Sequence, residues 1–236
     1  FGPNDKDIIF DTINYTKKNI IGYRNIYLIC YDPTIVIDDT ITINENIFFF
    51  TKKDIANILG ENSRNGWYLQ QLLKLYAGFA IPNILDNYLV IDSDTYFLKP
   101  TTFISKEGKF IFTTGSEYHI PYFEHMNKLD INFKKTHSLS GISHHCMFNK
   151  NIVYELFNIV ENNFNNKYKF WQLFLQKVDQ KHILGSGASE YEIYFTYINL
   201  YHSDKIVIRH LNWINSNTLI LNNNYDYVSV HWHMRR

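Results

Sequence analysis

The sequence predicts an α/β fold with a mostly parallel central sheet flanked by helices. Short apolar segments of strand length alternate with longer segments of helical spacing. One apolar strand, residues 87–91, leads directly into an acidic turn. Hydrophobic residues make up 45% and aromatic residues 17% of the 236 residues, enough for a sizeable core. Without a composition break or a linker, we expect one domain over residues 1–236.

Charge and hydropathy exclude several classes of protein. The 23 basic residues balance the 23 acidic ones, whereas sequence-blind nucleic-acid binders carry an excess of Lys and Arg. No apolar stretch approaches the ~20 residues of a membrane-spanning helix. The two cysteines do not form a disulfide framework, and Cys30 lies in an apolar segment typical of a buried thiol. We therefore expect no nucleic-acid partner, no membrane span and a cytoplasmic location.

The first half of the chain begins with a helix. Asn4 or Asp5 is expected to cap this helix, which ends near residue 19. Strands are then predicted at residues 25–30 and 43–50. A short helix at 54–59 follows, with Gly60 as its C-terminal stop.

The middle of the chain carries the clearest elements. Residues 66–80 place large apolar side chains at steps of three and four, which indicates a helix. Residues 87–91 form the apolar strand before Asp92, and Pro82 lies between the two elements.

The second half alternates in the same way, although residues 119–140 show no clear pattern. Strands are predicted at residues 110–114, 146–148, 205–209 and 227–232. Helices are predicted at residues 151–164, 168–178 and 189–200.

The strongest chemical signal is Asp92-Ser93-Asp94 at the end of the strand 87–91. Ligands of open α/β sheets bind beyond the carboxyl ends of the strands. Two carboxylates in one turn repel each other unless solvent or a cation separates them, and hard oxygen ligands suit Mn²⁺ or Mg²⁺. A solvated loop is the alternative. A phosphatase of the haloacid-dehalogenase type is disfavoured, because Tyr96 stands where that motif has Thr or Val.

Two histidines near the C-terminus are candidate metal ligands. On a strand over 227–232, His231 and the following His233 would face the same side. Neutral imidazole binds transition metals well, so either residue is a candidate to join the two aspartates. An ordinary surface pair is the alternative.

Glu190 is a candidate general base. Ser189 and Glu192 fit a capping box, which gives Glu192 a structural task. Glu190 lies in the first helical turn without such a task, so its carboxylate is available to accept a proton from a hydroxyl. The alternative is an exposed Glu that only interacts with the helix dipole.

Other polar residues are candidates for substrate contacts. His144 and His145 precede a strand and are suited to contact phosphate or acceptor, with a structural role expected for at least one. Arg64, one of five Arg, precedes the helix at 66–80 and is suited to bind a diphosphate or a carboxylate. Early turns of the same helix carry three further candidates, Trp67, Gln70 and Gln71.

Five segments resemble a family of uncharacterised glycosyltransferases of the GT-A type, which occurs in bacteria and large DNA viruses. In chain order they are GPND, GWYLQQLLKLYA, YLVIDSDTYFLKP, SGISHHCMF and SEYEIY. The resemblance covers nearly the whole chain and implies a Rossmann-type GT-A fold. It further implies an enzyme that uses Mn²⁺ or Mg²⁺ and a nucleotide-diphosphate sugar, with UDP as the expected nucleotide. A strand is expected before Phe1.

The resemblance also implies roles for individual residues. The nucleotide would lie against Gly2, Pro3, Asn4, Asp5 and the Asp92-Ser93-Asp94 turn. Asp94 would bind the metal directly, Asp92 would contact ribose or metal-bound water, and His231 or His233 would complete the shell. Glu190 would lie near the acceptor.

The sequence thus predicts a hexosyltransferase-type enzyme that moves a sugar from a nucleotide-diphosphate donor to a glycan or another hydroxyl acceptor. The alternative is a non-catalytic sugar- or nucleotide-binding module on the same fold. The joint presence of Asp92, Asp94 and Glu190 favours the enzyme.

Overall fold

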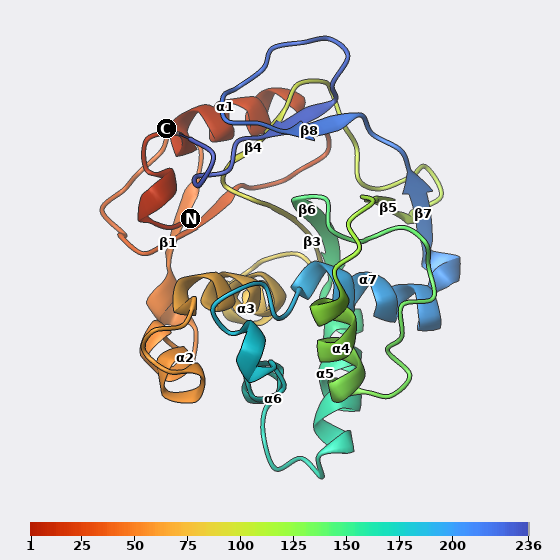
Figure 1. Ribbon diagram of the computed structural model, residues 1–236. Helices are drawn as coiled ribbons and strands as arrows, with labels where there is room; N and C mark the ends of the chain where they lie inside the picture. The colour runs from red at the N-terminus through yellow and green to blue at the C-terminus, as the bar shows by residue number, and fades with distance from the viewer. Residues whose placement is uncertain (236) are drawn as a thin grey trace.

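The computed structural model describes residues 1–235 and has a mixed α/β fold (Figure 1). Arg236, the last residue of the expected domain, lies outside the described range. Short strands lie between helices on two sides, with α1 on one side and α2, α3 and α5 on the other (Figure 1). The two chain ends lie near each other, because the Arg235 guanidinium donates 2.9 Å to the carbonyl of Asn4. None of the helices in the described residues is long and apolar enough to cross a membrane.

The elements alternate along the chain much as the sequence predicts. The helices are α1 (Ile9–Asn19), α2 (Lys52–Leu59), α3 (Asn65–Ala80), α4 (Ile120–Leu129), α5 (Lys150–Asn163), α6 (Phe170–Gln176) and α7 (Glu190–Tyr201). The strands are β1 (Tyr27–Cys30), β2 (Ile41–Asn44), β3 (Asn87–Ile91), β4 (Thr95–Phe97), β5 (Phe110–Thr113), β6 (His145–Asn149), β7 (Ile206–Arg209), β8 (Trp213–Asn215) and β9 (Tyr227–Ser229).

The strands of the described residues form four small sheets rather than one continuous sheet. The pairs β1–β2, β5–β7 and β8–β9 are parallel, whereas β3–β6 and β4–β9 are antiparallel. The α/β class is therefore confirmed, while the predicted central sheet is divided and mixed in direction.

The main core lies where α3, α5 and α7 pack on β3 and β6. Tyr88 of β3 stacks on Phe148 of β6 with ring centroids 5.6 Å apart. Its hydroxyl donates to the carbonyl of Leu75 in α3 at 3.2 Å, so the helix is fixed to the strand by a polar contact as well as by packing. Gly78 allows this approach, because a Cβ there would lie 2.7 Å from the Tyr88 ring.

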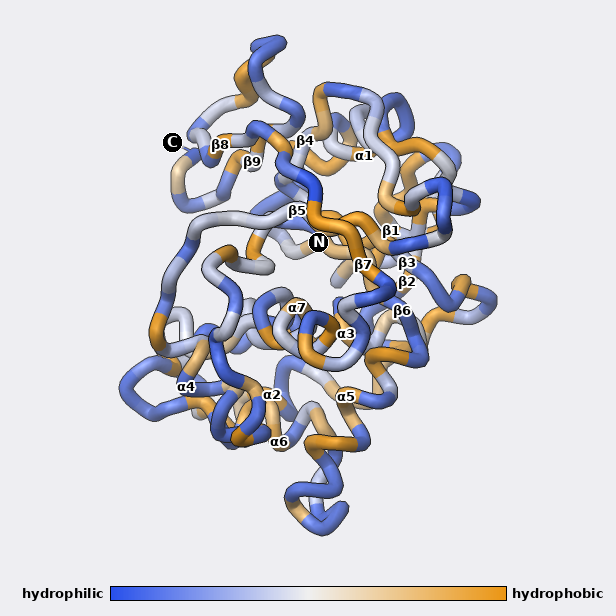
Figure 2. The backbone as a smooth tube through the Cα atoms, turned by 90° about the vertical axis from the view of Figure 1, so that its right-hand side faces the viewer, coloured by the Kyte–Doolittle hydropathy of each residue, from blue (hydrophilic) through white to orange (hydrophobic). Residues whose placement is uncertain are grey.

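Polar loops mark the periphery. Asn-rich residues 162–166 end α5 and begin the loop to α6, which is largely hydrophilic (Figure 2). Asn162 and Asn222 are exposed. Both cysteines are free and buried.

Three local predictions are wrong for identifiable reasons. The strand at 43–50 ends at Asn44, whose side chain accepts from the Asn46 N–H and starts a 3₁₀ turn. Neither Asn4 nor Asp5 caps α1, since Ile8 holds the cap position without a side-chain bond.

The third error concerns the C-terminal strand. It ends at Ser229 instead of 232, because the chain turns after Val230: the N–H of Met234 donates 2.9 Å to the carbonyl of His231. The short strands β4 and β8 and the helix α4 were not predicted. Three-residue strands have no measurable period, and α4 lies in the segment that showed no pattern.

We expect Gly78→Ala to destabilise the protein by about 1–3 kcal/mol, because the added methyl collides with the Tyr88 ring in a packed core. Gly66→Ala in the same helix is the matched control, since a Cβ there meets nothing within 4 Å. Urea unfolding of both variants checks this expectation. Equal stabilities of the two variants would show that Gly78 is not needed for the contact between α3 and β3.

Candidate functional site

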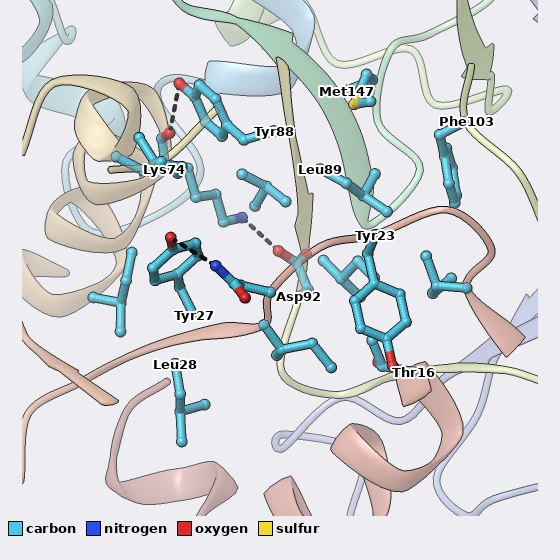
Figure 3. A pocket seen from close by; sticks show the side chains of 18 of the residues that line it. Thr16, Tyr23, Tyr27, Leu28, Lys74, Tyr88, Leu89, Asp92, Phe103 and Met147 are labelled. Carbon is cyan, nitrogen blue, oxygen red and sulfur yellow. Dashed lines mark hydrogen bonds and ion pairs between the residues drawn. The ribbon is translucent and has the colours of Figure 1, made fainter. Parts of the chain in front are cut away.

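A buried ion-pair cluster centred on Lys74 lies at the carboxyl end of β3. The Lys74 ammonium is 2.5 Å from Oδ1 of Asp92 and 2.7 Å from Oε1 of Glu190. It also lies 4.3 Å from the centre of the Tyr191 ring, and the Tyr191 hydroxyl donates to Asp92 at 2.8 Å. Figure 3 shows the Lys74 side chain reaching from α3 towards Asp92. Residues from α3, β3 and α7 thus meet at one point.

Local structure explains how the two carboxylates come together. Asp92 is the first residue after β3, and its N–H donates 2.9 Å to the carbonyl of His144 beside β6. Glu190 is the first residue of α7, and its N–H donates 3.1 Å to the side chain of Gln71. Glu190 is only 4% exposed, so the alternative of an exposed Glu at a helix start is wrong.

The charges of the cluster depend on one another. Burial alone would raise the pKa of Asp92, but Lys74 and His144 beside it hold that pKa well below its usual value. Burial raises the pKa of Glu190, and the nearby Asp92 adds to the rise although Lys74 opposes it. Burial would lower the pKa of Lys74, but the two carboxylates raise it. The site therefore holds one firmly ionised carboxylate and one carboxylate with a stronger affinity for protons.

A second group of side chains surrounds Asp94. Nδ1 of His231 lies 3.0 Å from Oδ2 of Asp94. Burial would lower the pKa of His231, but the bond to Asp94 and the Asp94 charge raise it above its usual value. His233 is exposed and stacks on His231 with ring centroids 5.4 Å apart. Because β9 ends at Ser229, both histidines lie in a turn and not on the predicted strand.

His144 joins the two groups. Its Nδ1 is 3.6 Å from Oδ2 of Asp92, and its ring centroid is 4.7 Å from that of His231. The residue has a φ of 62°, a left-handed conformation that a side chain other than Gly rarely adopts. Such backbone strain is typical of residues whose position matters for function. The Asp92 and Asp94 groups therefore form one continuous polar site.

His145 lies among buried aromatic side chains and not beside the aspartates, unlike His144. It is 2% exposed and packs edge-on against Phe97, Phe103 and Tyr227. Neither ring nitrogen has a hydrogen-bond partner among the described residues, and burial lowers its pKa to about 3. Its surroundings favour the structural role that the sequence left open for one of the two histidines.

The N-terminal segment touches the acidic turn. Ser93 donates its hydroxyl to Asp5 at 2.5 Å, and Asp5 is also paired with Arg235. Gly2 precedes the 3₁₀ turn Pro3–Asp5, which includes Asn4. Of the predicted nucleotide-binding residues in this segment, Asp5 is thus bonded to Ser93.

Arg64 and Trp67 lie together at the start of α3. The guanidinium is 4.4 Å from the centre of the Trp67 ring and donates 3.1 Å to the hydroxyl of Ser186. Two links join them to the cluster: the Ser186 loop that precedes Glu190, and α3 itself, where Gln71 bonds to Glu190 and Gln70 lines the same cavity as Lys74. The Nε2 of Gln71 is buried without a partner among the described residues.

Ser189 and Glu192 form half of the expected capping box. The Ser189 hydroxyl accepts from the Glu192 N–H at 3.2 Å. The Glu192 carboxylate turns away to Lys135 at 2.5 Å and to Ser140 at 2.9 Å. Glu192 therefore anchors the segment before β6, which carries His144.

A divalent cation beside Asp94 would need most of its coordination shell from water or from a bound ligand. The described residues contain no group of three or more His, Cys, Asp or Glu side chains able to hold a metal by themselves. Mg²⁺ and Mn²⁺ in phosphate-binding sites are commonly held by one or two protein ligands plus phosphate oxygens and water. Asp94 and His231 supply such a pair, whereas Asp92 is already engaged by Lys74 and Tyr191.

A family model described as a family of unknown function, DUF6492, matches residues 24–229. The chain belongs to this family. The DUF6492 match includes Lys74, Asp92, Asp94, His144 and Glu190, and it ends before His231. No relative was found among curated proteins.

Sequence reasoning missed Lys74 and Tyr191 in this DUF6492 chain. Lys74 is the only charged residue of α3 and lies between two leucines, which was a usable signal. A lone charge in an apolar helix needs a partner of opposite charge when the helix is buried. Tyr191 gave no such signal, because the chain is rich in aromatic residues.

We expect the loss in free energy of unfolding caused by Asp92→Asn to depend on pH. Because the folded state lowers the pKa of Asp92 below its ordinary value of 3.8, its ionised form stabilises the protein at neutral pH. That stabilisation is lost as the pH falls through the folded pKa. Urea unfolding should show a cost of about 2 kcal/mol at pH 7 that shrinks towards pH 3. The exposed Asp38, changed to Asn, is the control, with little cost at either pH. An equal cost of Asp92→Asn at both values would contradict the expectation.

Proposed function

We propose that this chain is a metal-dependent glycosyltransferase with a Rossmann-type fold of the GT-A kind. It moves a sugar from a nucleotide-diphosphate sugar, with UDP as the expected nucleotide, to a hydroxyl of a glycan or another acceptor. The observation that carries the proposal is the convergence of Asp92, Asp94 and Glu190 with two histidines at the carboxyl end of β3. This is the end of a strand at which α/β folds bind ligands.

Asp94 and His231 would hold the cation, and the pair stands 3.0 Å apart at the edge of the site. A bound Mn²⁺ or Mg²⁺ supplies a Lewis acid that offsets the charge of the leaving diphosphate. Lys74 keeps the Asp92 carboxylate ionised. The negative charge of Asp92 would then favour a cation beside Asp94. The neutral overall charge of the chain fits this arrangement, because no basic patch is needed to hold the phosphates.

Glu190 would accept the proton of the acceptor hydroxyl. Its raised pKa makes it a better base than an ordinary carboxylate, while Lys74 stabilises its ionised form. The bond from Gln71 to the Glu190 N–H fixes the helix start and so the direction of the carboxylate. This role applies to a reaction that inverts the sugar. In a reaction that retains its configuration, Glu190 orients the acceptor instead.

The donor nucleotide would lie against Ser93 and the segment from Gly2 to Asp5. Asp5 is held by Ser93 and Arg235, so the segment is tied to the acidic turn. Trp67 would contact the acceptor. Arg64, which the sequence assigned to a diphosphate or a carboxylate, stacks on Trp67 and bonds to Ser186 in the loop before α7, and it would act from there.

The proposal is tested by thermal unfolding with UDP-glucose, UDP-galactose, UDP-N-acetylglucosamine and GDP-mannose, each with and without Mn²⁺. One donor should raise the unfolding temperature only when Mn²⁺ is present, because both bind the folded state. Asp94→Asn should weaken Mn²⁺ binding at least about tenfold. Asp130→Asn is the matched control, since Asp130 and Asp94 are both 8% exposed and Asp130 bonds only to α4, α5 and their loops.

Glu190→Gln separates catalysis from binding in the same assay. It should keep the donor-dependent shift and lower sugar transfer by about 100-fold or more, because the proton acceptor is lost while the residues proposed to hold the donor and the cation are unchanged. Full activity in EDTA would contradict the metal role. Donor binding by the unchanged chain without transfer or hydrolysis would favour the non-catalytic binding module.

A further inference from the structure

Aromatic and polar side chains from three segments surround Ser186, in the loop before α7. The Ser186 hydroxyl accepts 3.1 Å from the guanidinium of Arg64, which precedes α3. The Ser186 carbonyl accepts 2.8 Å from Nε2 of His119, which precedes α4. The same loop leads into Glu190, the first residue of α7. We call this region the Ser186 surface and define it by six residues: Arg64, Trp67, Tyr118, His119, Leu184 and Ser186.

The apolar side chains of the Ser186 surface are open to solvent. Tyr118 is 70% exposed and Leu184 is 67% exposed, although both are large. Trp67 is half-buried, with the Arg64 guanidinium 4.4 Å from the centre of its ring. The surface therefore presents two aromatic rings beside Ser186. One is linked to it through Arg64, and the other through the neighbouring His119.

The loop that carries Ser186 is held against α3. Nη1 of Arg64 donates 3.2 Å to the carbonyl of Gly185 as well as to Ser186. A Cβ at Gly187 would lie 2.9 Å from the Tyr68 hydroxyl, so the loop packs on α3 too closely for a larger residue there. The groups of the surface are thus in place before a ligand arrives, which reduces the entropy lost on binding.

This combination of groups suits a sugar. A pyranose ring has C–H faces that the negative face of an aromatic ring attracts, and hydroxyls that need hydrogen-bond partners. Tyr118 and Trp67 supply aromatic rings. Arg64 uses Nη1 for the loop, so its Nε and Nη2 take no part in those two bonds and can donate to hydroxyl oxygens. The exposed Glu117 next to Tyr118 balances the charge of Arg64, so the surface has no excess charge that favours an ion.

We propose that the Ser186 surface binds a linear oligosaccharide, whose terminal sugar is directed towards Glu190 while the following sugars stack on Trp67 and Tyr118. The acceptor is then a chain of several sugars rather than a single sugar or a small alcohol. Its role as the acceptor rests on the proposed transferase function, because Glu190 is the proposed base. Binding of the chain does not depend on that function.

A glycan array read with the labelled full chain, without donor or Mn²⁺, tests the binding. The array carries single sugars and linear trisaccharides and hexasaccharides of glucose, N-acetylglucosamine, galactose, mannose and xylose. In at least one series the hexasaccharide should bind at least about tenfold more tightly than the single sugar, because it reaches both rings.

Variants of exposed aromatic residues locate the binding on the Ser186 surface. Tyr118→Ala and Trp67→Ala should each weaken binding of that hexasaccharide about fivefold or more, because each removes one stacking ring. Tyr154→Ala is the matched control, since Tyr154 is 57% exposed and lies on α5 against Phe79. It should bind the hexasaccharide as tightly as the unchanged chain does.

Three results would overturn the proposal. The first is binding that does not increase with chain length in any series. The second is an equal effect of Tyr118→Ala and Tyr154→Ala. The third is binding to peptides printed on the same array, but not to glycans, that Tyr118→Ala weakens, because the surface would then belong to a protein partner.

Transfer assays separate this proposal from the proposed function. The KM of the hexasaccharide acceptor should lie at least about tenfold below that of the single sugar, and Tyr118→Ala should bring the two values closer together. Transfer with equal KM values for both acceptors would contradict the oligosaccharide acceptor and leave the transferase function standing. Length-dependent glycan binding by a chain that binds no donor would contradict the transferase function and leave the binding surface standing.

Discussion

The contact between the Lys74 ammonium and two buried carboxylates determines how the site is built. A lysine in the middle of an apolar helix is costly to bury unless opposite charges meet it. Asp92 and Glu190 meet it from the end of β3 and the start of α7. The three elements are therefore held together at the place where the candidate chemistry lies, and removing Lys74 would leave two buried carboxylates without their shared cation.

The same contact gives the acidic residues of the site different charge states and different proposed roles. Asp92 is kept ionised and bonds to Lys74 and Tyr191, so in the proposed function Asp94 is the carboxylate that would hold a cation beside His231. Glu190 keeps a raised pKa, as a proton acceptor requires. His144 has a left-handed backbone conformation and contacts both groups, through Asp92 and through the ring of His231.

Sequence patterns predicted the elements that carry their own period. β3 was predicted at its observed bounds and α3 within one residue, because a continuous apolar strand and a long amphipathic helix are both strong local signals. Their positions at the end of a strand or the start of a helix identified three candidate site residues: Asp92, Asp94 and Glu190. Lys74 was missed although its place in an apolar helix signalled a buried partner, because the partners themselves lie 18 and 116 residues away in the sequence. The division of the sheet could not be predicted either, because pairing between strands depends on contacts between residues far apart in the chain.

A double-mutant cycle between Lys74→Met and Glu190→Gln, measured by urea unfolding at pH 7, tests the central claim most directly. Each single variant leaves a buried charge with one partner fewer, whereas the double variant removes both charges. The account predicts that the double variant is less destabilised than the sum of the two single variants by about 1–3 kcal/mol. Costs that add within about 0.5 kcal/mol would show that the two side chains do not act together, and would contradict the account.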